Sequence, residues 1–168
     1  TKAVTNTRKL ISENKVDVVI GSTITPNSLA MTDVVADAET PMISMAASAR
    51  IVDPASPKTK WVFKTPQSDS LMADAIAINM KASGVKTMGY IGFADGYGDG
   101  WLAEMRRSAQ LAGIKIVGEE KYNRTDASVT GQVLKLVAAN PDAILIAAAG
   151  TPGATPQKEL VARNYKGK

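Results

Sequence analysis

Hydrophobic positions along the chain follow two periods, one typical of amphipathic helices and one typical of short buried strands. Residues 16–20 form a mostly apolar, β-branched run that ends at Gly21, which predicts a strand buried on both faces of a parallel sheet. A hydroxyl-rich loop follows, and Pro26 suits the first turn of a helix with Thr25 as its N-cap. Ligands of open α/β sheets bind in such loops, at the carboxyl ends of strands.

The same unit repeats along the chain. Helices are expected at residues 1–14, 27–38, 69–83, 98–112, 128–140 and 155–164, and strands at 16–20, 42–44, 87–92, 114–118 and 143–149. In the helix at 69–83, the predicted buried face consists of Leu71, Met72, Ala75, Ile76, Asn79 and Met80. Alternation of this kind predicts an α/β fold with parallel strands.

Residues 50–66 interrupt this alternation. Two X-Pro pairs mark turns, and residues 61–65 then form an extended run that has no helix of its own. We interpret this run as a strand that carries the chain from one sheet into another. The expected division is therefore residues 1–63 in one lobe and residues 64–168 in a second lobe.

Composition excludes several classes of function. The 168 residues contain no His and no Cys, so Ser-His-Asp and Cys-His catalysis, disulfides and most zinc sites are excluded. The net charge of +4 comes from scattered Lys and Arg with few aromatic residues, which argues against nucleic-acid binding. No apolar run reaches the ~20 residues that a membrane span needs. The chain begins without Met and shows no signal peptide, which suggests that it starts inside a larger, exported protein.

The glycine-rich stretch at residues 92–100 lies where a dinucleotide fingerprint would lie, between a strand and a helix. Its spacing is not that of the fingerprint, and Asp95 and Asp99 would repel a pyrophosphate. It also lacks the alternating ligands of a calcium loop, so we expect no metal and no cofactor. The glycines suit a tight strand-to-helix turn. Tyr97, between two of them, could instead stack on a ligand and hydrogen-bond it.

Five segments together resemble a known family. They are residues 18–21 with the hydroxyl loop, 41–48, 61–65, 92–100 and 140–143. In order and spacing they resemble the periplasmic solute-binding proteins of branched-chain amino acid ABC transporters, the leucine-isoleucine-valine type. The resemblance covers essentially the whole chain.

The resemblance implies a type I periplasmic binding fold, in which two Rossmann-like lobes are joined by hinge strands and hold the ligand between them. The chain would be a central fragment of such a protein. It would capture a small carboxylate-bearing solute, such as a branched-chain or other amino acid, in the periplasm and present it to permease subunits in the inner membrane. It would not be an enzyme. The alternatives are a same-fold protein for aromatic acids, a ligand-sensing domain and, more remotely, a Rossmann-like enzyme.

The resemblance also implies site residues. Thr25 falls on a contacting Ser, Ala46 on a residue that contributes backbone, Ser48 on a contacting Thr, and Tyr97 on a Tyr that closes over the ligand. Thr23 in the hydroxyl loop and Thr151 after the last strand complete the candidate set, although Thr23 and Thr25 equally suit capping and turn roles.

The chain departs from the family pattern in its second lobe. Residues 149–151 are small where the family commonly has a bulky aromatic, and the carboxylate that usually meets a ligand ammonium would lie beyond Lys168. The resemblance therefore supports a small carboxylate ligand better than an amino acid in particular.

Overall fold

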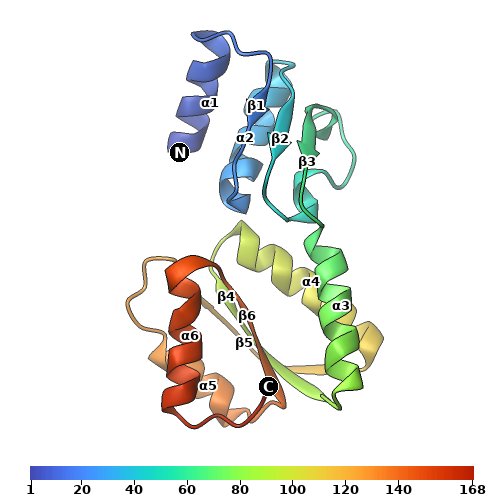
Figure 1. The fold of residues 1–168 in the computed structure, drawn as a ribbon, viewed down its shortest axis with the longest axis vertical. Coiled ribbons are helices and arrows are strands. Elements are labelled where there is room, and N and C mark those ends of the chain that lie inside the picture. The colour runs from blue at the N-terminus through green and yellow to red at the C-terminus, as the bar shows by residue number, and fades with distance from the viewer. The chain divides into compact units, whose positions relative to one another are not determined.

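The computed structural model describes all 168 residues, which form two compact units, Thr1–Asp69 and Ser70–Lys168 (Figure 1). Each unit contains one three-stranded sheet with parallel strands, as the alternation of helices and strands predicted. The assignment of residues 1–63 and 64–168 to two lobes stays a prediction.

The first unit consists of α1 (Lys2–Ser12), β1 (Val19–Ile20), α2 (Thr25–Asp37), β2 (Met42–Ser44), the 3₁₀ turns Ala49–Ile51 and Thr59–Trp61, and β3 (Val62–Lys64). Its strands are ordered β1-β2-β3. The extended run expected at 61–65 therefore pairs with β2 in the first sheet.

One face of the first sheet is covered and the other is open. Val19, Met42 and Val62 are in register and buried, and they form the core with residues of α2. The next register row has Ile20 and Phe63 at its two ends, and these side chains are 68% and 56% exposed. The prediction of a first strand buried on both faces is therefore wrong within this chain, because α1 packs against α2 and not against the open face.

The second unit consists of α3 (Asp69–Ala82), β4 (Thr87–Phe93), α4 (Gly96–Ala112), β5 (Lys115–Tyr122), α5 (Thr130–Ala138), β6 (Ala143–Ala147) and α6 (Gly150–Ala162). The strand order is β5-β4-β6, and β4 is buried along nearly its whole length. Helices α3 and α4 cover one face of this sheet, and α5 and α6 cover the other (Figure 1). This double cover gives the apolar β4 a core on both faces.

The second unit differs from expectation in several details, including the end of β5, which lies at Tyr122 and not at residue 118. Leu71 is 61% exposed and Ala75 is also exposed, whereas Ala73 and Ala77 are buried, so the buried stripe of α3 is rotated toward small residues that allow close packing. Helix α6 begins at Gly150, five residues before the predicted start. A proline in the first turn of a helix, such as Pro152, removes only an N–H that has no helical partner, so it does not delay the start.

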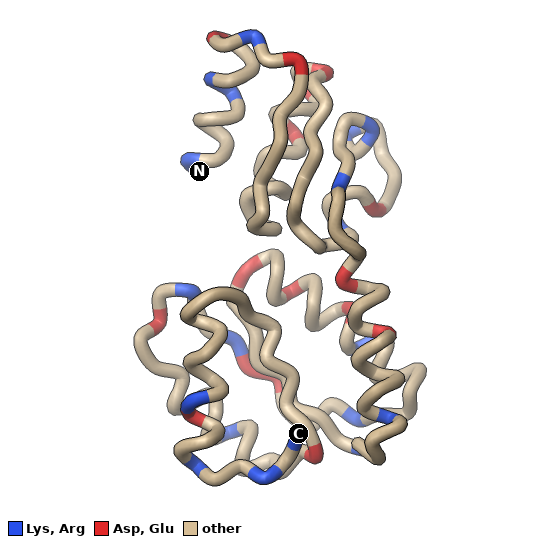
Figure 2. Tube along the Cα trace, in the orientation of Figure 1, with Lys and Arg blue, Asp and Glu red and all other residues tan.

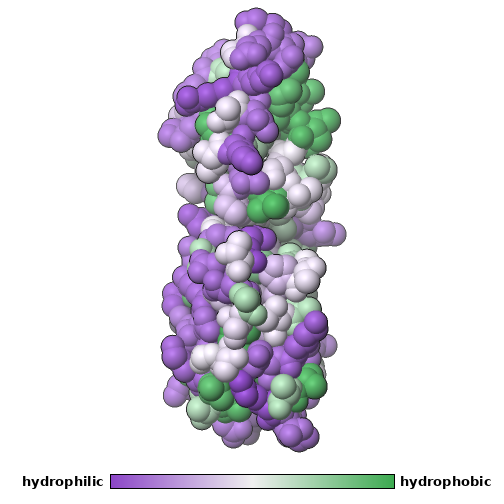
Figure 3. Space-filling view, turned by 90° about the vertical axis from the view of Figure 1, so that its left-hand side faces the viewer, coloured by the Kyte–Doolittle hydropathy of each residue, from purple (hydrophilic) through white to green (hydrophobic).

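Charges of both signs are interleaved along the two units (Figure 2). Polar residues cover most of the face shown in Figure 3, where apolar side chains gather in separate patches. None of the helices has the length and apolar character that crossing a membrane requires. No group of three or more acidic residues is arranged to hold a metal ion.

Candidate functional site

The loops that follow β1 and β2 are bonded into one structure around the carbonyl oxygen of Ser22. This oxygen accepts a hydrogen bond from the Met45 N–H at 3.1 Å and lies 3.1 Å from Ser28 Oγ and 3.4 Å from Ser44 Oγ; one of these hydroxyls donates to it and the other donates to its neighbouring hydroxyl. The Ser28 and Ser44 hydroxyls lie 2.8 Å apart and are buried. Because the strands are adjacent and parallel, the two loops meet at the carboxyl edge of the sheet, where open α/β sheets bind ligands.

Two buried hydroxyls at this edge have no hydrogen-bond partner. Thr25 Oγ1 and Ser48 Oγ are shielded from solvent, in residues that are 2% and 1% exposed, yet neither donates to nor accepts from any protein atom. A buried polar group without a partner costs ~1–3 kcal/mol, so native proteins rarely retain one without a reason. A ligand oxygen at this edge would supply the missing partner.

Thr25 is not the N-cap of α2, so that prediction is wrong. The N-cap is Ile24, whose carbonyl accepts from the Asn27 and Ser28 N–H groups at 3.1 Å, and no side chain caps the helix. Ser22 Oγ accepts from the Ile24 N–H at 3.0 Å and serves the turn instead. The Thr25 hydroxyl therefore has no capping role.

Asp69 positions the loop that carries Ser48, a role that the sequence pattern did not predict. Its N–H donates to the Ala47 carbonyl at 3.1 Å, and its Oδ1 accepts from the Ala49 N–H at 2.9 Å. The residue is 2% exposed. An acid at the start of a predicted helix was the only available signal, and it is equally typical of an ordinary helix N-terminus.

The other first-unit candidates differ in burial and in hydrogen bonding. Ala46 is buried, and its N–H donates to Ser44 Oγ at 3.2 Å, so this backbone donor is already engaged. Thr23 is exposed and its hydroxyl makes no hydrogen bond. Lys64 ends β3 at the same sheet edge, where Nζ donates to the Pro66 carbonyl at 2.6 Å, and partial burial lowers the pKa of its ammonium.

The glycines after β4 allow α4 to approach the strand closely. A Cβ on Gly98 would lie 1.9 Å from the Phe93 carbonyl oxygen, and the buried Tyr90 hydroxyl donates to the Gly98 carbonyl at 2.7 Å. Burial raises the pKa of Tyr90. Asp95 is the N-cap of α4, because its Oδ1 accepts from the Tyr97 and Gly98 N–H groups at 2.8 and 3.3 Å. The stretch therefore forms a tight, capped strand-to-helix turn.

Tyr97 lies in the first turn of α4, and not in a loop before it as expected. Its half-buried ring is 6.3 Å from the Phe93 ring and 6.4 Å from the Trp101 ring, centroid to centroid. Part of the ring therefore packs within the unit. The remaining part is exposed at the carboxyl end of the sheet.

Arg124 is a further charged group at this end of the second sheet, and its place was not foreseen. It follows β5, donates from Nε to Asp95 Oδ2 at 2.7 Å, and lies over the Phe93 ring at 4.1 Å from the ring centroid. A cation just beyond a strand end was the available signal, but the side chain's direction could not be inferred from it.

Thr151 lies in the first turn of α6, after β6, and is exposed. Strands β6 and β4 are adjacent, so Thr151 and Tyr97 both begin helices at the carboxyl end of the second sheet. The structure thus brings Thr25, Ala46 and Ser48 to one edge of the first unit, and Tyr97, Arg124 and Thr151 to one edge of the second.

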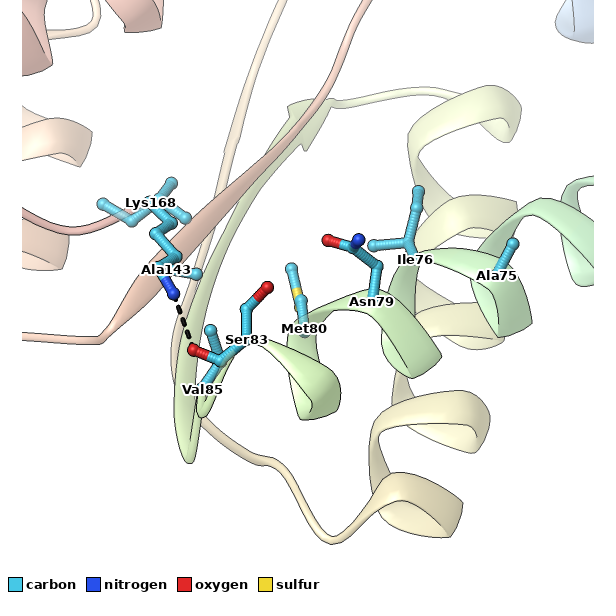
Figure 4. Close-up of a pocket in the computed structure, with 9 residues that line it drawn as sticks. Ala75, Ile76, Asn79, Met80, Ser83, Val85, Ala143 and Lys168 are labelled. Atoms are coloured by element: carbon cyan, nitrogen blue, oxygen red, sulfur yellow. Dashed lines mark hydrogen bonds between the residues drawn. The ribbon is translucent and has the colours of Figure 1, made fainter.

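A cavity of about 380 Å³ lies elsewhere in the second unit (Figure 4). It is bordered by α3, by Val85 just before β4 and by Ala143 at the start of β6, and Lys168 Nζ donates to the Ser83 carbonyl at its side. These positions are at the amino ends of the strands. The cavity contains none of the candidate residues.

Comparison with known proteins gives concordant results. A family model described as "Periplasmic binding protein" matches residues 1–168. An extracellular ligand-binding receptor from Rhodopseudomonas palustris HaA2 matches with a TM-score of 0.95 and 49% identity, over 99% of this chain and 46% of that receptor. No match was found among curated proteins.

Two more distant structures share the fold. A periplasmic binding protein type 1 from Bordetella pertussis Tohama I matches with a TM-score of 0.88 and 24% identity, over 99% of this chain and 46% of that one. The other is a solute-binding protein of an ABC transporter from R. palustris HaA2, solved in complex with p-hydroxybenzoic acid. It matches with a TM-score of 0.87 and 20% identity, over 98% of this chain and 44% of that one. The chain spans less than half the length of these three structures. It belongs to the periplasmic binding protein family and has part of the family's type I fold.

Proposed function

We propose that this chain is the central part of a solute receptor of an ABC transporter, which captures a small carboxylate-bearing ligand in the periplasm and presents it to membrane permease subunits. The observation that carries the proposal is the pair of buried, unpartnered hydroxyls, Thr25 Oγ1 and Ser48 Oγ, at the carboxyl edge of the first sheet. Family membership supports the transport context.

The chemistry of this edge suits a carboxylate. A hydroxyl donates to a carboxylate oxygen, and a hydrogen bond to a charged group contributes ~1.5–3 kcal/mol. Helix α2 begins at Thr25, and the positive end of its dipole favours negative charge there. The bond between the Ser28 and Ser44 hydroxyls and the contacts of Asp69 hold the two loops in place before a ligand arrives.

The second unit, in this proposal, supplies Tyr97 as an aromatic contact and Thr151 as a polar one. Small residues precede Thr151, and they leave space that an aromatic ring could fill. The relative solved with p-hydroxybenzoic acid indicates that this fold accommodates an aromatic carboxylate. The candidate ligands are therefore aromatic and aliphatic carboxylic acids, with amino acids as a further class.

The same hydroxyls argue for binding without turnover. A serine or threonine becomes a nucleophile when an adjacent base accepts its proton, and neither Thr25 Oγ1 nor Ser48 Oγ has any such partner. The chain also has no His to act as that base.

Titration calorimetry on the full-length, ligand-free protein tests the proposal. The probes are p-hydroxybenzoate, 3-phenylpropanoate, 4-methylpentanoate and leucine, and the variants are Thr25→Val and Ser48→Ala. Each variant should weaken binding of the best probe by roughly ten- to a hundredfold. Thr32→Val is the matched control, since the Thr32 hydroxyl bonds to the Ser28 carbonyl within α2. Unchanged affinity in both site variants would refute the proposed role of these hydroxyls.

A further inference from the structure

Arg124 connects the turn after β5 to the first turn of α4. Its Nε donates to Asp95 Oδ2 at 2.7 Å. The other oxygen of the same carboxylate, Oδ1, accepts from the Tyr97 N–H at 2.8 Å and from the Gly98 N–H at 3.3 Å. Asp95 therefore bonds both to the guanidinium of Arg124 and to the backbone that carries Tyr97.

The guanidinium also contacts the aromatic rings at this end of the sheet. Its central carbon lies 4.1 Å from the Phe93 ring centroid and 5.9 Å from the Tyr97 ring centroid. The two rings are themselves 6.3 Å apart, centroid to centroid, and tilted by 48°. A guanidinium within about 6 Å of a ring centroid is attracted to the ring. Arg124 therefore restrains both the backbone and the ring of Tyr97.

The charge of Arg124 is balanced inside the protein. The Arg124 and Asp95 side chains are 33% and 20% exposed, so their ion pair is screened less than a fully exposed one. A planar guanidinium suits this place, because it forms the ion pair at its edge and stacks on Phe93 with its face. A cation paired in this way acts on its neighbours in the protein, and we assign it no ion pair with a ligand.

We propose that Arg124 is a positioning residue for the ligand contact of Tyr97, and that it holds the Tyr97 ring in its binding orientation before a ligand arrives. The proposal rests on the proposed function, in which Tyr97 contacts the ligand. A side chain that is already ordered loses less conformational freedom on binding than a mobile one. Loss of the restraint should therefore weaken the Tyr97 contact and let the ligand leave faster, with little change in association.

Stopped-flow kinetics on the full-length, ligand-free protein test this role. The probe is the preferred acid, defined as whichever of p-hydroxybenzoate, 3-phenylpropanoate, 4-methylpentanoate and leucine binds most tightly. Arg124→Gln should raise its dissociation rate by roughly three- to tenfold, which is within the range of couplings between contacting residues. Arg124→Lys should restore part of the slow release, because Lys keeps the ion pair with Asp95 but lacks the planar face.

Arg106→Gln is the matched control. Arg106 on α4 pairs with Glu119 on β5, so it joins the same helix to the same strand by an ion pair that includes neither Tyr97 nor Asp95. This variant should release the preferred acid at the wild-type rate, even if its melting temperature falls. A lowered melting temperature of Arg124→Gln with an unchanged release rate would make Arg124 a structural residue only, against the inference.

Asp95→Asn tests the same ion pair from its other side and remains informative if Arg124→Gln folds poorly. Asn is as good an N-cap as Asp, so this variant keeps an acceptor for the Tyr97 and Gly98 N–H groups and removes only the charge. It should release the preferred acid faster, to about the extent that Arg124→Gln does, and the double variant should be no faster than either single one. Wild-type release by Asp95→Asn would overturn the inference.

A double-mutant cycle with Tyr97→Ala separates positioning from direct contact with the ligand. If Arg124 acts through Tyr97, then Arg124→Gln should not raise the dissociation rate further once the ring is absent, at temperatures well below every melting transition. Multiplication of the two effects would mean that Arg124 acts on the ligand without Tyr97, contrary to the inference. Normal release by Tyr97→Ala alone would also contradict it.

The outcomes separate this inference from the proposed function. If the inference fails while Thr25→Val and Ser48→Ala still weaken binding, the proposed function stands. Failure of every probe to bind would overturn both.

Discussion

The Ser28 hydroxyl hydrogen-bonds to the Ser44 hydroxyl at 2.8 Å and links the first turns of α2 to the end of β2. Both hydroxyls are buried and fully engaged within the protein. Thr25, in the first turn of α2, and Ser48, in the loop after β2, are equally buried and have no partner. Four hydroxyls in one local environment thus divide into two that bond within the protein and two that have no partner there.

This division predicts opposite effects on the stability of the ligand-free protein. Thr25→Val and Ser48→Ala remove a buried hydroxyl that has no partner, and each should raise the free energy of unfolding by ~1 kcal/mol or leave it unchanged. Ser44→Ala removes bonds to Ser28, Ser22 and Ala46, and should lower it by ~1–3 kcal/mol. Thermal and urea unfolding of the ligand-free protein measure these changes in the free energy of unfolding. Destabilisation by Thr25→Val as large as that by Ser44→Ala would mean that Thr25 is a structural residue.

Tyr97→Phe separates the hydroxyl of Tyr97 from its ring. Because the ring packs against Phe93 and Trp101, Tyr97→Ala should lower the melting temperature, whereas Tyr97→Phe should not. If the hydroxyl contacts the ligand, Tyr97→Phe should raise the dissociation rate by roughly tenfold with little change in association. Stopped-flow kinetics with the preferred acid measure both rates. Normal release by Tyr97→Phe would assign the hydroxyl no part in binding.

Gly98→Ala should destabilise the second unit severely. Its new Cβ would lie 1.9 Å from the Phe93 carbonyl oxygen, and backbone at that position cannot yield easily. The expected loss is about 3 kcal/mol or more, at the upper end of overpacking effects. Gly131→Ala is the control, since its Cβ would meet nothing within 4 Å near the start of α5, and it should stabilise by ~0.5–1 kcal/mol. Equal unfolding midpoints for the two variants would contradict the close approach of α4 to β4.

Asp142 predicts acid sensitivity. It accepts from the Lys86 and Thr87 N–H groups and the Thr87 hydroxyl, and these bonds hold its pKa below the ordinary value. A carboxyl with a lowered folded pKa contributes stability that is present above its unfolded pKa, about 4, and is lost as the pH falls below that value. Between about pH 5 and about pH 3, the melting temperature of Asp142→Asn should therefore fall less than that of the wild type.

The control is Asp17→Asn, because Asp17 is exposed and makes no hydrogen bond or ion pair. The melting temperature of this variant should fall as much as that of the wild type between about pH 5 and about pH 3. Identical slopes for the wild type and Asp142→Asn would show that the Asp142 bonds contribute no pH-dependent stability.

Apolar periodicity was sufficient to predict the order of elements. It placed β2 at Met42–Ser44 without error, because a short strand between Pro41 and a small-residue loop leaves few alternatives. It failed at Leu71, because both flanks of the Met72–Ile76–Met80 line are apolar and only packing selects the flank with Ala73 and Ala77. It also failed at Ile20, whose exposed face depends on what covers the sheet and not on the strand itself.

The sequence predicted the location of the candidate site better than it predicted the contacts within the site. Strand ends located the segments that carry Thr25, Ser48 and Tyr97, since parallel strands present their carboxyl ends at one edge. The roles of Asp69 and Arg124 were not predictable, because each depends on a partner distant in sequence, Ala49 or Asp95. Bonds of that kind become visible only when the loops are folded.

Mass spectrometry of the small molecule released by denaturing the full-length protein, purified from its native source, tests the central claim most directly. The account predicts a small organic acid, present in near-stoichiometric amount in the wild type and depleted in the Thr25→Val, Ser48→Ala double variant. Retention of the acid by the double variant, or release of a ligand that has no carboxylate, would contradict it.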